Sequence, residues 1–146
     1  MIYVKYKKLT ETAITPVKGS RGAAGFDLHA DIDSNLYNRP GETRMIHTGI
    51  SMEIPDGYFG AIYARSSLGV NRNLRPPNCV GIIDSDYRGN IAVPLINDST
   101  HTQIVQAHER VAQLVIQPVI DAQLYEVAEL SETDRGSGGF GSTGRL

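Results

Sequence analysis

The chain has no tryptophan and a single cysteine, Cys79, among its 146 residues. One cysteine excludes an internal disulfide, which suits a reducing compartment. We expect Cys79 to be a small buried hydrophobe, because it lies in an apolar run. No apolar run reaches the roughly 18 residues that a membrane-spanning helix needs, and Lys5 introduces charge too early for a signal peptide. These absences favour a cytoplasmic protein with no membrane partner.

The sequence also lacks an excess of positive charge. Fourteen Lys and Arg residues against 16 Asp and Glu residues give a formal net charge of -2. Proteins that bind nucleic acids usually carry a basic stripe, so we expect no nucleic-acid partner. A polyanionic ligand would have to be held by local positive charges, because the overall field does not attract it. The length suits one soluble globular domain.

Helical periodicity is scarce, whereas alternation with a period of two is common. Ile46, Thr48, Ile50, Met52 and Ile54 fall on one face of an expected strand. Further strands are expected at 2–6, 58–64, 80–83, 91–96, 111–119 and 122–127. Many short strands separated by turns predict an all-β sandwich or barrel.

Two details of this pattern can be checked directly. Residues 80–83 and 91–96 are expected to pair as a hairpin across a polar turn, with Pro94 at a bulge or an edge. One short helical turn is expected after Ser66, over about residues 68–73.

From Ser131 onward the chain is mostly Gly, Ser and Thr, and such a segment cannot bury enough surface to order itself. We therefore expect a β domain over residues 1–130 and a flexible C-terminal arm over 131–146.

Common catalytic and nucleotide-binding motifs are missing or incomplete. Residues 139–144 match G-x-G-x-x-G, but only two residues follow them, so no helix can receive a pyrophosphate. The four histidines are scattered and form no zinc motif. No G-x-S-x-G nucleophile elbow is present.

Five short segments carry a more specific signal. They are Ala24–Leu28, Ala64–Gly69, Asn78–Gly89, Glu109–Leu114 and Arg135–Gly144. Their order and spacing resemble the five motifs of the trimeric dUTPase family, from about Ala24 to Gly144. The resemblance implies a single-domain jelly-roll-like β-barrel, a homotrimer with active sites at subunit junctions, and an arm that closes over the substrate. It also implies hydrolysis of dUTP to dUMP and pyrophosphate, which limits uracil in DNA and supplies dUMP for dTMP synthesis.

The resemblance assigns roles within the third segment. It makes Asp84 the general base that activates water for attack on the α-phosphate, a task that a carboxylate can perform. It sets Tyr87 against the deoxyribose, where the ring leaves no room for a 2′-hydroxyl. The resemblance also implies a uracil slot, lined by Asn78, Ile82, Ile83 and Ala92. Taken alone, the same residues also fit a polar turn with a half-buried aromatic ring.

Three further segments are assigned to the phosphates and the base. Arg65, Ser66 and Ser67 offer a planar guanidinium and hydroxyl donors, although in isolation they also fit a solvated loop. The list of ligand-binding residues is completed by Gln113, Arg135, Phe140 and Gly141, with Phe140 stacking on the base. We expect Asp27 and Arg110 to be ion-paired supports. Mg²⁺ is implied as the cofactor, held mainly by substrate phosphates and water, with no direct protein ligand.

Two other functions stay open from the sequence. A related dCTP deaminase would share the barrel, although the Tyr87 and Phe140 motifs argue against it. A regulatory dUTP sensor would bind without turnover, against which both Asp84 and the arm argue. The sequence departs from the family pattern at Ala64, at His108 and in the basic, proline-bearing stretch 71–77. None of these departures removes a reacting group.

Overall fold

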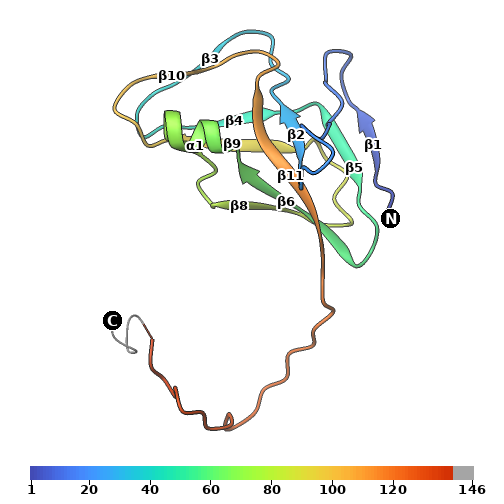
Figure 1. Ribbon diagram of the computed structural model, residues 1–146, viewed down its shortest axis with the longest axis vertical. Helices are drawn as coiled ribbons and strands as arrows, with labels where there is room; N and C mark the ends of the chain where they lie inside the picture. The colour runs from blue at the N-terminus through green and yellow to red at the C-terminus, as the bar shows by residue number, and fades with distance from the viewer. Residues whose placement is uncertain (140–146) are drawn as a thin grey trace.

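The computed structural model describes residues 1–139 and is mostly β, with one short helix in this range (Figure 1). The strands are β1 Lys5–Lys8, β2 Phe26–His29, β3 Leu36–Asn38, β4 Thr43–His47, β5 Ile50–Glu53, β6 Tyr58–Ala64, β7 Leu74–Arg75, β8 Val80–Ile83, β9 Ala92–Asn97, β10 Gln103–Val105 and β11 Arg110–Pro118. The helix is α1, Ser66–Arg72. The expectation of an all-β chain is confirmed.

Two sheets contribute most of the core. One has the strand order β2-β11-β6-β8 and the other β4-β9-β7, while β1-β5 and β10-β3 form two-stranded sheets. Buried side chains of both larger sheets belong to one cluster, including Leu28, Ile62 and Leu114 on one side and Ile46 and Leu95 on the other. The alternation seen in the sequence therefore buries one face of each sheet against the other.

Several strands match their predicted positions. β6 and β8 have the predicted bounds, β11 is shifted by one residue, and α1 lies within two residues of the expected turn. The predicted face from Ile46 to Ile54 is buried, but Gly49 interrupts the strand with φ 65° and divides it into β4 and β5. The alternation predicted one strand because the same side chains stay buried on both sides of the turn, so the pattern of apolar residues does not reveal it.

Other expectations are wrong. β8 and β9 do not form a hairpin, because β8 pairs with β6 and β9 pairs with β4 and β7. No strand forms at residues 122–127. Cys79 is an exposed free thiol, not a buried one, because it lies in the turn before β8 with φ 64°. Short local patterns do not determine which partner a strand finds.

Pro94 lies where a proline can be tolerated. It pairs with Met45 of β4, and β7 reaches only Ile96 and Asn97 on the other side of β9. The register runs through Pro94 without a shift. The predicted bulge is absent, and although β9 is the middle strand of its sheet, Pro94 lies in a part of β9 that is paired on one side only, where a proline is better tolerated.

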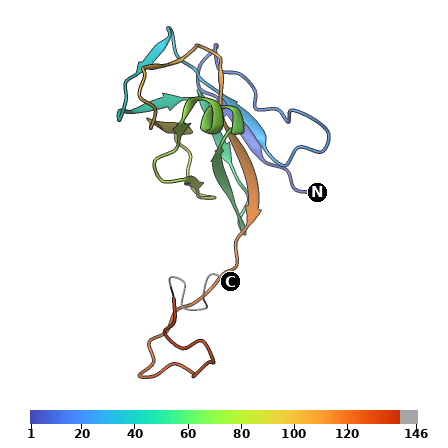
Figure 2. The ribbon, with the colours of Figure 1, turned by 60° about the vertical axis from the view of Figure 1, so that its left-hand side comes forward.

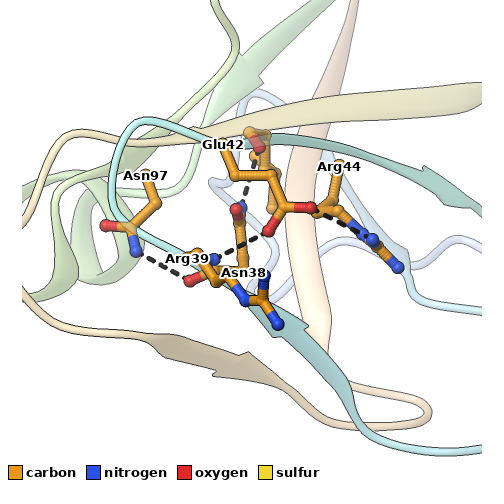
Figure 3. Close-up of polar contacts among 6 residues, drawn as sticks. Asn38, Arg39, Glu42, Arg44 and Asn97 are labelled. Carbon is orange, nitrogen blue, oxygen red and sulfur yellow. Dashed lines mark hydrogen bonds and ion pairs between the residues drawn. The ribbon is translucent and has the colours of Figure 1, made fainter.

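A buried amide network joins β3 and β9 (Figure 3). Asn38 donates to the Leu95 carbonyl at 2.9 Å, and Asn97 donates to the Asn38 carbonyl at 2.8 Å. Figure 3 also shows Glu42 accepting from the Arg39 backbone and from Arg44 in the adjoining turn. Both asparagines are fully buried, so these bonds satisfy side-chain N–H groups that water cannot reach, while Asn38 Oδ1 has no partner among the described residues. The network fixes the end of β9.

The chain beyond β11 does not join either sheet. β11 ends at Pro118, and the segment that follows runs away from the body in both ribbon views (Figures 1 and 2). Its apolar side chains are open, with Leu124 99% and Tyr125 83% exposed. No membrane-spanning helix occurs among the described residues, since none is long and apolar enough.

Candidate functional site

A carboxylate held between two arginines organises one end of the four-stranded sheet. The Asp27 carboxylate lies 3.2 Å from Arg65 Nε through one oxygen and 3.2 Å from Arg110 through the other. Asp27 comes from β2 and Arg110 from β11, which pair directly, and Arg65 follows β6 on the other side of β11. The expected ion pairing of Asp27 and Arg110 is confirmed. One negative and two positive groups leave a local surplus of positive charge.

These groups line a polar hollow of about 290 Å³. Its lining includes Asp27, Arg65, Ser66, Arg110 and Gln113, together with the loop that precedes β2, at Gly19, Ser20, Ala23 and Gly25. Gln113 is half-buried and donates to the Ala64 carbonyl at 3.3 Å, which gives this polar side chain its partner. Arginines with hydroxyl and amide donors are suited to binding phosphate oxygens.

The sequence did not identify the loop before β2 as part of this hollow. Ser20 is one of its lining residues, yet it precedes the first recognised segment. The signal was present in the small residues around it, Gly19 and Gly22 to Gly25, which allow the backbone to approach a ligand closely. Loops of this composition occur in many proteins without binding anything, so the pattern alone was not specific.

His29 adds a neutral group beside this charged cluster. Burial lowers the pKa of His29 below its usual range, although Asp27 opposes the shift. Arg110, Arg65 and His108 also lower its pKa, because each would repel an imidazolium. Among the described residues, His29 Nδ1 is buried without a hydrogen-bond partner. His29 therefore stays neutral near pH 7 and adds no third cation to the pair of arginines.

The loop between β8 and β9 carries Asp84 and Tyr87. The Tyr87 hydroxyl donates to the Asn90 carbonyl at 3.0 Å, so the ring folds back over its own loop. A Cβ at position 89 would lie 2.3 Å from the Tyr87 hydroxyl oxygen, which only a glycine avoids. Outside the loop, Ser51 donates to the Arg88 carbonyl at 2.7 Å and Gly49 N–H donates to the Asn90 side chain at 3.1 Å. The turn before β5 and β5 itself therefore help to set the position of the tyrosine ring.

The residues assigned to the uracil slot follow the edge of a sheet. β8 is the last strand of its sheet and pairs only with β6 in the described part of the chain. Its outer side presents backbone N–H and C=O groups without a strand partner. Ile82 is exposed and Ile83 is half-buried on this strand, Asn78 is exposed before it, and half-buried Ala92 opens β9.

Within a single chain, the residues predicted for the site do not all lie close together. Asp84 follows Ile83, which pairs with Gly60, whereas Arg65 follows Ala64 at the other end of β6. With about 3.3 Å of rise per residue, Asp84 and Arg65 lie roughly 20 Å apart along the strands. Ser67 is exposed on α1 and is not part of the hollow.

The remaining predicted residues lie in the C-terminal segment. Arg135 is exposed and donates to the Gly138 carbonyl at 2.8 Å. Phe140 and Gly141 lie outside the described residues. Within residues 1–139, no group of three or more His, Cys, Asp and Glu side chains is arranged to hold a metal ion.

Comparisons with known proteins identify the family of the chain. The family model described as dUTPase matches residues 11–144. A deoxyuridine 5'-triphosphate nucleotidohydrolase from Nautilia profundicola is 47% identical, over 97% of this chain and 99% of the relative. One of the same name from Hydrogenobaculum sp. is 45% identical, over 94% of this chain and 95% of the relative.

Solved structures give the same result for the fold. The Staphylococcus bacteriophage 80alpha dUTPase with dUPNHPP has a TM-score of 0.85 at 27% identity, covering 99% of each chain. A mutant of the 80alpha phage dUTPase has a TM-score of 0.87 at 26% identity, over 96% of this chain and 98% of that one. Family model, relatives and fold agree over nearly the whole length, and the chain belongs to the dUTPase family.

Proposed function

We propose that this protein hydrolyses dUTP to dUMP and pyrophosphate. The observation that carries the proposal is the polar hollow around the Asp27-held Arg65, in a chain that belongs to the dUTPase family. In the cell this reaction would limit the incorporation of uracil into DNA and supply dUMP for the synthesis of dTMP.

The hollow is the proposed phosphate subsite. Arg65 presents its guanidinium there. Its ion pair with Asp27 already restricts the Arg65 side chain, which reduces the conformational entropy lost when phosphate binds. Ser66 adds a hydroxyl, Gln113 adds an amide, and Ser67 is proposed to turn toward the phosphates when substrate binds. The two arginines against one carboxylate give the local positive charge that the net charge of -2 does not supply.

The edge of β8 is the proposed uracil subsite. Unpaired backbone donors and acceptors at fixed spacing can match the edge of uracil and mismatch that of cytosine. Asn78, Ile82, Ile83 and Ala92 are proposed to line this slot, whose narrow width would reject the methyl group of thymine. Tyr87 is proposed to lie against the deoxyribose.

Asp84 is the proposed general base. Its side chain is exposed on the loop after β8, and water can therefore reach it. The carboxylate takes a proton from that water, the water oxygen bonds to the α-phosphorus, and the bond from that phosphorus to the bridging oxygen breaks. The electron pair leaves with pyrophosphate, and dUMP keeps the new oxygen.

Mg²⁺ is the proposed cofactor, and it would enter with the substrate. A nucleoside triphosphate carries about four negative charges, more than Arg65 and Arg135 can neutralise. Both oxygens of Asp27 are engaged by arginines, so the fit for Mg²⁺ is with phosphate oxygens and water. When bound, the ion would neutralise charge that develops on the phosphates.

The active unit is proposed to be a homotrimer with sites at subunit junctions. Asp84 and Arg65 of one copy lie at opposite ends of the β6–β8 pair, which supports a site shared between copies. The exposed apolar side chains of the segment after β11, including Leu124 and Tyr125, suit burial against another copy. Residues 1–130 form the proposed domain, and 131–146 the proposed arm that brings Arg135, Phe140 and Gly141 to the substrate.

A cytoplasmic location is also proposed. Cys79 is an exposed free thiol, and exposed thiols persist in a reducing compartment.

A release assay tests the proposed function. The protein is incubated with Mg²⁺ and dUTP, dCTP, dTTP or UTP, and both pyrophosphate and the nucleotide product are measured. Pyrophosphate and dUMP should form from dUTP alone. Deamination of dCTP would identify a deaminase, and binding of dUTP without turnover would identify a sensor.

Tyr87 provides a specific prediction about the sugar. Replacing Tyr87 with alanine should narrow the gap in kcat/KM between dUTP and UTP by about tenfold, because the ring no longer excludes the 2′-hydroxyl. Tyr87→Phe keeps the ring and should retain most of the discrimination. Steady-state kinetics on both substrates provides the measurement. An equal loss on both would mean that the ring only supports its loop.

A further inference from the structure

The helix that follows Arg65 has little apolar contact to hold it in place. α1 has seven residues, of which only Leu68 is buried, and Val70 is 80% exposed. A helix this short is marginal without tertiary support. Arg65 and Ser66 at its start line the phosphate hollow, so any looseness of α1 would move groups that bind phosphate.

A charged contact holds the other end of the helix. Arg72, the last residue of α1, donates to the Glu109 carboxylate at 2.5 Å, to the Gln103 side chain at 3.2 Å and to the Ile104 carbonyl. The second Glu109 oxygen accepts the Gln106 N–H at 2.9 Å. One guanidinium therefore joins the helix both to β10 and to the connection between β10 and β11.

Both ends of α1 are tied to adjacent residues at the start of β11. Arg72 pairs with Glu109, and the next residue, Arg110, pairs with Asp27, which in turn pairs with Arg65. The chain of contacts therefore runs from the last residue of α1 back to Arg65, the N-cap residue of the same helix. We propose that Arg72 is a positioning residue that holds Arg65 and Ser66 in the phosphate subsite through its contact with Glu109. This inference rests on the proposed function of that subsite.

A second ion pair in the same stretch serves as a comparison. Arg75 lies on β7 and pairs with Asp98 at 2.6 Å. The side chains of that pair are 44% and 41% exposed, whereas those of Arg72 and Glu109 are both 25% exposed. Arg75 is the natural control, because its pair does not lead to the hollow and is more fully screened by water.

The test compares Arg72→Met with Arg75→Met in the full-length protein. Inhibition by pyrophosphate reports on the phosphate subsite, and inhibition by deoxyuridine, which has no phosphate, reports on the base subsite. Arg72→Met should raise KM for dUTP and Ki for pyrophosphate about tenfold, as expected for misplaced binding groups, with Ki for deoxyuridine unchanged. Arg72→Lys keeps the charge but loses the several N–H donors of the planar guanidinium, and it should have a smaller effect in the same direction. Arg75→Met should leave all three constants near wild type.

Other outcomes would overturn the inference. An unchanged Ki for pyrophosphate would show that the contact does not position the subsite. Equal weakening of pyrophosphate and deoxyuridine, or equal effects of Arg72→Met and Arg75→Met, would indicate a general structural role. If Arg72→Met fails to fold, Arg72→Lys and Glu109→Gln carry the same comparison. Absence of dUTP turnover in the wild type would instead contradict the proposed function, while pyrophosphate binding by calorimetry would still test the positioning role.

Discussion

Replacing Asp84 with asparagine should lower kcat for dUTP by about 100-fold or more while dUTP still binds. The substitution keeps the shape of the side chain but removes the group that accepts the proton of the attacking water. The side-chain hydrogen bonds that hold the loop involve Ser51, Tyr87, Arg88 and Asn90 and do not use the Asp84 carboxylate, so the loss of its charge should not disturb the loop. Steady-state kinetics measures kcat, and calorimetry with a non-hydrolysable imido analogue of dUTP measures binding.

Asp86 gives a matched control for this experiment. It is an exposed carboxylate on the same loop, two residues from Asp84 and without an assigned role. Asp86→Asn should change kcat by no more than about threefold, since surface substitutions away from a site have small effects. If Asp84→Asn retained the wild-type kcat, the general base would have to be another group. Loss of analogue binding would instead assign Asp84 to substrate binding.

Deleting residues 131–146 should abolish most hydrolysis and leave the melting temperature and native mass nearly unchanged. Residues 131–137 are exposed, and the hydrogen bonds of Arg135 and Gly136 stay within the segment. Few contacts with the body are therefore lost from residues 131–139, the part of the segment that the structure describes. Activity should fall because the deletion would remove Arg135 from the proposed phosphate subsite and prevent the proposed closure, which would expel water and strengthen the electrostatics of the site.

Activity and native mass must be measured on the same truncated protein. Phe140→Ala in the intact chain should cause a smaller loss of the same kind, because only the stacking on the base is removed. Glu132→Gln, an exposed change in the same segment, is the control and should have little effect. Full activity of the truncated protein would refute a closing arm. Dissociation of the proposed trimer would show that residues 131–146 contribute to assembly.

The strands that could be predicted are those whose buried face repeats without interruption. β6, β8 and β11 are of this kind, and their apolar residues alternate or run continuously between clear turns. The short strands β3, β7 and β10 span two or three residues, which is too few for a period to emerge. The segment 122–127 has apolar residues that suggest a strand but no pairing partner within the described part of the chain. A strand forms only where another backbone accepts its hydrogen bonds.

The five segments and their order were enough to predict the family, because chemistry-bearing residue types at fixed spacing are local properties of a sequence. They predicted a β fold and the residues assigned to base, sugar and phosphates. The contact of Asp27 with both Arg65 and Arg110 depended on the tertiary structure, because β2, β6 and β11 meet only when the sheet assembles. The separation of Asp84 from Arg65 also depended on the tertiary structure, because the pairing of β6 with β8 sets it. Sequence spacing cannot supply such distances, since long-range strand pairing decides which side chains share a surface.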